Sequence, residues 1–94
     1  MKNLDDLVMY TYKRYTYPKS WWSKAHFEKR CLEIYTSEQI ILKCMDKPFV
    51  ECKDIIENYI FELYGCRKES VHTNTIKKLN IMISTAEHLY TYLS

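Results

Sequence analysis

The stretch from residue 10 to residue 24 interleaves aromatic and basic side chains more densely than any other part of the chain. Aromatic rings beside cations can stack on nucleic-acid bases and bind phosphates, and they also dominate the strongest contacts of protein interfaces. We expect a protein-binding surface here, formed by Tyr10, Lys13, Arg14, Tyr17, Lys19, Trp21, Trp22 and Lys24. Continuing the helical stripe of Leu4, Leu7 and Val8 predicts that Tyr12 and Tyr15 lie on or near the core-facing side, and that Tyr10, Lys13, Arg14 and Tyr17 lean toward solvent. Trp21 and Trp22 are adjacent and cannot both point the same way, so we expect at least one of them to be partly exposed.

A second candidate site is the hexapeptide Arg67-Lys68-Glu69-Ser70-Val71-His72. Its arginine and histidine are spaced as in the R-x4-H element, so the segment resembles that of HEPN-type ribonucleases. The resemblance covers six residues and implies RNA cleavage without metal, in which His72 would move protons and Arg67 would contact the phosphate. Lys68 departs from the polar amide that commonly follows the arginine. We treat this ribonuclease as the alternative to a non-enzymatic interaction module, and we do not expect enzymatic activity.

The charge is distributed unevenly along the chain. Residues 1–30 carry a formal net charge of +4, residues 31–64 carry −4 and residues 65–94 carry +2, which agrees with the total of +2. A basic end can steer the protein toward an acidic partner or toward nucleic acid. A third alternative, which rests only on the small size and single-domain organisation of the chain, is a nucleic-acid-binding accessory protein of a phage or mobile element.

The cysteines and histidines do not form a recognisable metal or redox motif. The four cysteines contain no CxxC pair, and His26, His72 and His88 are scattered. If the second and third helices fold back near Pro48, Cys44 would lie beside Cys52 and Cys31 beside Cys66. We expect reduced thiols, no metal and no cofactor, and the single glycine excludes a glycine-rich phosphate loop.

The composition predicts how these residues are positioned. With 94 residues, 47% of them hydrophobic, the chain has room for one domain spanning 1–94. One glycine and two prolines are too few for the turns of an all-β domain. We therefore predict an all-α fold, a small antiparallel bundle of about four helices, and leave a homodimer open. The chain shows no signal-peptide pattern and no apolar run of membrane-spanning length, so we expect a cytoplasmic protein without a membrane partner.

Local signals predict the helix boundaries. Asn3 can cap a first helix that ends before Pro18, and Ser20 can cap a second that reaches toward Pro48. Thr36 with Gln39 matches a capping box, which leaves open whether residues 20–46 form one helix or two. Pro48 suits the first turn of a third helix that Gly65 would end as a left-handed cap. Thr73, Asn74 or Thr75 can cap the fourth.

Overall fold

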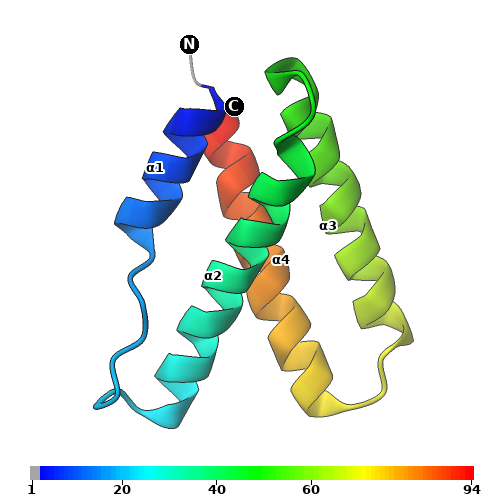
Figure 1. The fold of residues 1–94 in the computed structure, drawn as a ribbon. Helices are drawn as coiled ribbons and strands as arrows, with labels where there is room; N and C mark the ends of the chain where they lie inside the picture. Colours follow the sequence, from blue (N-terminus) through cyan, green and yellow to red (C-terminus); the bar gives the residue numbers. More distant parts are fainter. Residues whose placement is uncertain (1–2) are drawn as a thin grey trace.

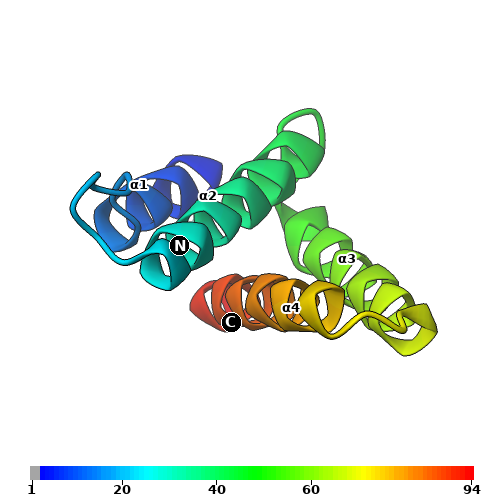
Figure 2. The ribbon, with the colours of Figure 1, turned by 90° about the horizontal axis from the view of Figure 1, so that it is seen from below.

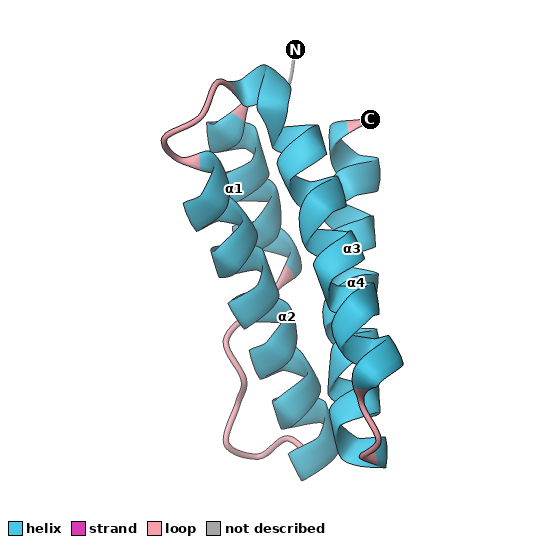
Figure 3. Ribbon diagram, turned by 90° about the vertical axis from the view of Figure 1, so that its right-hand side faces the viewer, coloured by secondary structure: helices cyan, strands magenta, loops and turns pink. Residues whose placement is uncertain are grey.

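The computed structural model describes residues 3–94 and contains four α-helices connected by short loops (Figure 1). Their bounds are α1 Leu4–Arg14, α2 Lys24–Cys44, α3 Cys52–Glu69 and α4 Thr73–Leu93, and a 3-10 turn, Phe49–Glu51, precedes α3. The chain is 80% helical, and residues 3–94 contain no strand, which confirms the predicted all-α bundle. From the side, α1 and α2 form one layer and α3 and α4 the other (Figure 3).

The core lies around α4, which packs against both α2 and α3. Ile83, Ala86 and Leu89 of α4 are buried, as the spacing of an amphipathic helix requires. They meet buried residues of the other helices, namely Leu7, Ile40, Cys44, Cys52, Ile56, Tyr59 and Leu63. The stability of the fold therefore depends on α4 more than on any other helix.

The first helix begins as predicted and ends earlier. The Asn3 side chain accepts a hydrogen bond from the Asp6 backbone N–H at 2.9 Å, and the Asp6 carboxylate accepts one from the Asn3 backbone N–H at 3.0 Å. This capping box satisfies two N–H groups that the helix itself leaves unpaired. Arg14 is the last helical residue, and Tyr15 is extended. Residues 15–23 form a loop, so Tyr17, Trp21 and Trp22 are presented from irregular backbone.

The second helix is a single helix and begins later than predicted. The Ser23 hydroxyl, and not Ser20, accepts the capping hydrogen bond from the His26 N–H at 3.3 Å. The capping box expected at Thr36 and Gln39 does not form. The Thr36 hydroxyl is buried and donates to the Leu32 carbonyl at 2.8 Å, so the residue that signals a helix start is instead satisfied within the helix.

The prediction that Gly65 ends the third helix is wrong. The backbone of Gly65 does not adopt a positive φ, and α3 continues to Glu69, with Ser70 as the C-cap. The Ser70 hydroxyl donates to the Cys66 carbonyl at 2.8 Å, which satisfies an acceptor at the helix end. His72, one residue before the predicted Thr73, is the N-cap of α4 and makes no capping hydrogen bond through its side chain.

Replacing Gly65 with alanine is expected to stabilise the protein. A Cβ added at Gly65 meets no atom within 4 Å, and the helical backbone suits an L side chain. Alanine exceeds glycine in helix propensity by about 0.5 to 1 kcal/mol, so the urea midpoint should rise without a change in slope. If Gly65 were a left-handed cap, the alanine would instead destabilise the protein. A lowered urea midpoint would therefore contradict the helical placement of this residue.

Candidate functional site

Tyr15 divides the aromatic and basic segment between two sites. This side chain is only 6% exposed and lines both an apolar groove and a basic pocket. Tyr12 and Tyr17 line the groove, whereas Arg14 lines the pocket. The segment therefore does not form the single continuous surface that the sequence suggests.

The apolar groove lies between α1 and α2 and has a volume of about 170 Å³. Its lining residues are Val8, Thr11, Tyr12, Tyr15, Tyr17, Ile34, Glu38 and Ile41. Tyr12 is 72% exposed and Tyr17 is 73% exposed, so both rings extend into solvent at the groove. The prediction that Tyr12 faces the core is wrong, because the line through Val8 and Tyr12 follows the outer edge of the α1–α2 contact, where Val8 itself is exposed.

The prediction for Tyr10 is also wrong, in the opposite direction. Its ring is half-buried and stacks on Tyr92 of α4, with 3.8 Å between the ring centroids. Its hydroxyl makes a short hydrogen bond with Nε2 of His88. The Tyr92 hydroxyl donates to the Asp6 carbonyl at 3.5 Å. Because α1 packs against the end of α4 as well as against α2, it has a second buried side that its own periodicity does not reveal.

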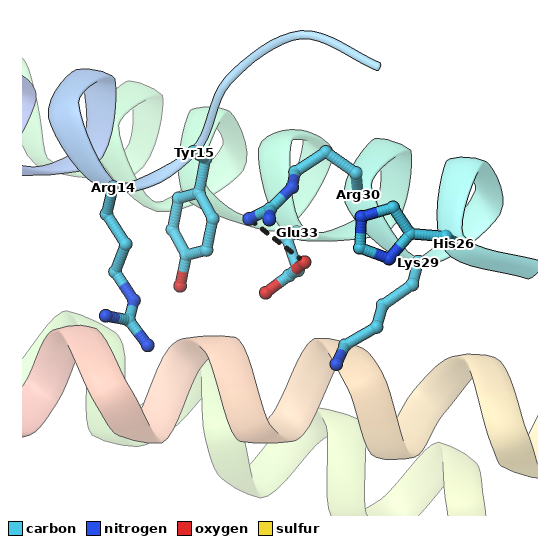
Figure 4. A pocket seen from close by; sticks show the side chains of 6 residues that line it. All are labelled: Arg14, Tyr15, His26, Lys29, Arg30 and Glu33. Atoms are coloured by element: carbon cyan, nitrogen blue, oxygen red, sulfur yellow. Dashed lines mark ion pairs between the residues drawn. The ribbon is translucent and has the colours of Figure 1, made fainter. Parts of the chain in front are cut away.

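The basic pocket has a volume of about 290 Å³ and is lined by Arg14, Tyr15, His26, Lys29, Arg30 and Glu33 (Figure 4). Arg14 and Lys29 extend toward α4 on either side of the Glu33 carboxylate. Arg30 and Glu33 form an ion pair, with 3.4 Å from Nη1 to Oε1, and their side chains are 21% and 16% exposed. This is the only ion pair in the described part of the chain, residues 3–94. Arg14 and Lys29 are therefore not neutralised there.

The pocket and the adjacent helix α4 perturb two titratable side chains. Burial raises the pKa of the Tyr15 hydroxyl above its ordinary value, so Tyr15 remains a neutral hydrogen-bond donor at neutral pH. Burial, followed by the positive charge of Arg14, lowers the pKa of His88 on α4. Both shifts favour the neutral forms of these two side chains.

The tryptophans and remaining lysines of the segment lie at the protein surface to different degrees. Trp21 is 77% exposed, which confirms that at least one tryptophan is exposed. Trp22 is half-buried, with its ring centroid 4.4 Å from that of His26 and 5.9 Å from the Arg30 guanidinium. Lys13, Lys19 and Lys24 are exposed. Trp22 thus supports the basic pocket, whereas Trp21 extends into solvent.

Arg67 and His72 lie around the connection between α3 and α4. Arg67 donates from Nη1 to Oδ1 of Asn80 at 2.8 Å, and its guanidinium lies 4.6 Å from the centroid of the Tyr64 ring. His72 is exposed where α4 begins. The Arg67 side chain thus links the last turn of α3 to Asn80 of α4.

The two predicted cysteine pairs have different outcomes. Cys44 and Cys52 are buried next to each other, and burial together with the neighbouring Cys52 thiol raises the pKa of Cys44 to about 12. Such a thiol is a poor nucleophile, because the thiolate is the reactive form. The prediction that Cys31 lies beside Cys66 is wrong, since α2 and α3 diverge away from their connection (Figures 1 and 2). Both of these cysteines are exposed.

Sequence reasoning missed four pocket residues, His26, Lys29, Arg30 and Glu33. Their spacing of three to four residues places them on one side of α2, and this spacing is the feature of the sequence that could have identified them. What the sequence could not show is that the end of α1 closes the site. Within residues 3–94 no group of three His, Cys, Asp or Glu side chains could hold a metal ion.

Comparison with known proteins does not place the chain in a family: no family model matches it, and no curated protein or solved structure is significantly similar to it. None of the described helices is both long enough and apolar enough to span a membrane. The structure is that of a small all-α bundle in which residues of the 10–24 segment line an apolar groove and a basic pocket that meet at Tyr15.

Proposed function

We propose that the protein is a non-enzymatic interaction module that binds a partner protein in the groove between α1 and α2. The observation that carries the proposal is the exposure of two large aromatic side chains, Tyr12 and Tyr17, at one apolar groove. Exposed aromatic rings beside a concave apolar surface are typical of the residues that contribute most to protein binding. Val8, Ile34 and Ile41 supply the apolar walls against which a partner side chain can pack.

The charge around the groove indicates the chemistry of the partner segment. Lys13 follows Tyr12 directly, Lys19 lies two residues after Tyr17, and residues 1–30 carry a net charge of +4. Glu38 is the only acidic residue that lines the groove. We infer that the partner presents a short apolar segment with acidic flanks, because complementary charge speeds encounter and selects orientation.

The proposal is tested by replacing Tyr17 with alanine. The protein partner is captured from the native host, identified and purified, and its affinity is measured by calorimetry. We expect Tyr17→Ala to weaken binding about tenfold or more, as loss of a central aromatic contact does, with little effect on thermal stability. Tyr12→Ala should behave in the same way.

Phe61→Ala is the matched control, because Phe61 is also an exposed aromatic residue but lies on α3, away from the groove. This variant should bind the partner as the wild type does. Equal binding by Tyr17→Ala, Tyr12→Ala and wild type would contradict the proposal. So would capture of nucleic acid alone, or self-association as the sole interaction.

A further inference from the structure

The basic pocket offers a binding site that the proposed partner groove does not use. We propose that it binds a phosphate monoester dianion, held mainly by Arg14, Lys29 and Arg30. The pocket lies on the other side of Tyr15 from the groove, and the proposal stands independently of the partner protein.

Charge is the first argument. Three permanent cations, Arg14, Lys29 and Arg30, line the pocket with one carboxylate, Glu33, so two positive charges remain unbalanced. Glu33 pairs with Arg30 only. Like charges around one pocket repel one another, and an anion bound there would reduce this repulsion. A dianion balances the excess, whereas the single charge of a phosphodiester neutralises half of it.

Hydrogen-bonding capacity is the second argument. Nε of Arg30 is buried and makes no hydrogen bond with any of residues 3–94. Buried donors are normally paired. This nitrogen has almost no accessible surface, so an anion reaches it only when the guanidinium turns toward the pocket. Phosphate oxygens suit an arginine because two parallel N–H donors can bind two oxygens at once. The neutral Tyr15 hydroxyl is a further donor in the pocket wall.

Preorganisation is the third argument. The Arg30 guanidinium lies 5.6 Å from the centroid of the Tyr15 ring and 5.9 Å from that of Trp22, and Glu33 holds its Nη1. Aromatic contacts and an ion pair therefore restrict this side chain before any ligand arrives. A restricted side chain loses less conformational entropy on binding, so more of the interaction energy contributes to affinity. Arg14, His26 and Lys29 are exposed and can adjust around the anion.

Size restricts the ligand class. The volume of about 290 Å³ lies at the lower end of small-molecule sites, which span roughly 300 to 1,000 Å³. The pocket therefore fits a phosphate group and the first atoms of its carrier. Two sources share this chemistry, a small phosphorylated metabolite and a phosphorylated side chain of another protein.

The test titrates the full chain at pH 7.5, where a monoester is largely dianionic, with inorganic phosphate, phenyl phosphate and dimethyl phosphate. The readout is the Nε–Hε signal of Arg30 in nitrogen-15 NMR spectra, which responds to a change in the surroundings or hydrogen bonding of the guanidinium. We expect phosphate and phenyl phosphate to shift this signal saturably, and dimethyl phosphate to bind at least tenfold more weakly. Equal binding of dimethyl phosphate would overturn the dianion assignment.

Two variants locate the site. Lys29→Gln removes an exposed cation, and Arg30→Gln removes the cation that is ion-paired with Glu33. Each variant should weaken phenyl phosphate binding at least tenfold. Because Arg30 is mostly buried, Lys29→Gln tests the site even where Arg30→Gln disturbs folding. Arg67→Gln, an arginine change on α3, is the matched control and should bind as the wild type does. Wild-type affinity in Lys29→Gln would overturn the proposal, as would the absence of any saturable shift.

A phosphotyrosine peptide distinguishes the sources of the phosphate group. Tighter binding than phenyl phosphate supports the site and assigns it to a phosphorylated protein, whereas equal or weaker binding supports the site and assigns it to a small molecule. Tyr17→Ala should leave phenyl phosphate binding unchanged, so failure of the pocket and failure of the partner groove are separate results.

Discussion

Replacing Leu89 with alanine is expected to destabilise the protein by about 3 kcal/mol, within the range of roughly 2 to 5 kcal/mol found for buried leucines. Leu89 is fully buried in α4, which packs against both α2 and α3. The truncation removes apolar contacts and leaves a cavity among residues that three other helices contribute. Domains of this size are stable by about 5 to 14 kcal/mol in total, so the loss is a large fraction.

Thermal unfolding measured by circular dichroism tests this expectation. A loss of about 3 kcal/mol should lower Tm by roughly 12 to 24 °C in a domain of this length. Leu42→Ala is the matched control, because it makes the same leucine-to-alanine change on α2, where the Leu42 side chain is 60% exposed. It should alter stability by less than about 0.5 kcal/mol. Similar Tm values for the two variants would contradict the placement of α4 at the centre of the core.

Leu7→Ala is expected to release α1 from the bundle. Leu7 is the only buried residue of α1, and Leu4 and Tyr10, both partly buried, also pack against the core, Tyr10 by stacking on Tyr92. Removing its side chain should cost about 2 to 3 kcal/mol, and much of this loss should appear as local opening, since an isolated helix of 11 residues is marginal in water. At about 1.4 kcal/mol for each factor of ten, the amides of α1 should exchange roughly 30 to 150 times faster.

Val8→Ala is the control for this variant, because Val8 neighbours Leu7 but is exposed. Its α1 amides should exchange at nearly the wild-type rate. Since α1 carries Tyr12 into the groove and Arg14 into the pocket, Leu7→Ala should also weaken binding at both sites. Unchanged exchange in α1 would show that Leu7 does not anchor the helix.

Several elements were predictable because the interactions that form them are local. The N-cap at Asn3 and the amphipathic faces of α3 and α4 follow from residues three or four positions apart. Predictions based on single residues that often mark the ends of helices were less successful. Gly65 is compatible with a left-handed cap and with a helix interior, and Thr36 is compatible with a cap and with a buried position whose hydroxyl bonds its own helix. Burial explains the position of Thr36 inside its helix, whereas Gly65 is exposed and a Cβ added there meets no atom within 4 Å, so packing does not account for its conformation.

The orientation of the aromatic side chains depended on contacts between residues far apart in the sequence. Tyr10 is turned inward by Tyr92 and His88, which lie about eighty positions later, and no periodicity within residues 4–14 contains that information. Tyr12 is exposed for the complementary reason, because neither α2 nor α4 covers that side of α1.

The sequence by itself determined that the chain is an all-α bundle of four helices, since helix formation follows from apolar periodicity and from the scarcity of glycine and proline. It also determined that aromatic and basic side chains gather near residues 10–24. Only the tertiary structure decided that these side chains divide between two sites and that Arg14 joins His26, Lys29 and Arg30 around one pocket. The physical reason is that residues of different helices must come together to form a binding site. How the buried faces of the helices pack sets the distances between those residues.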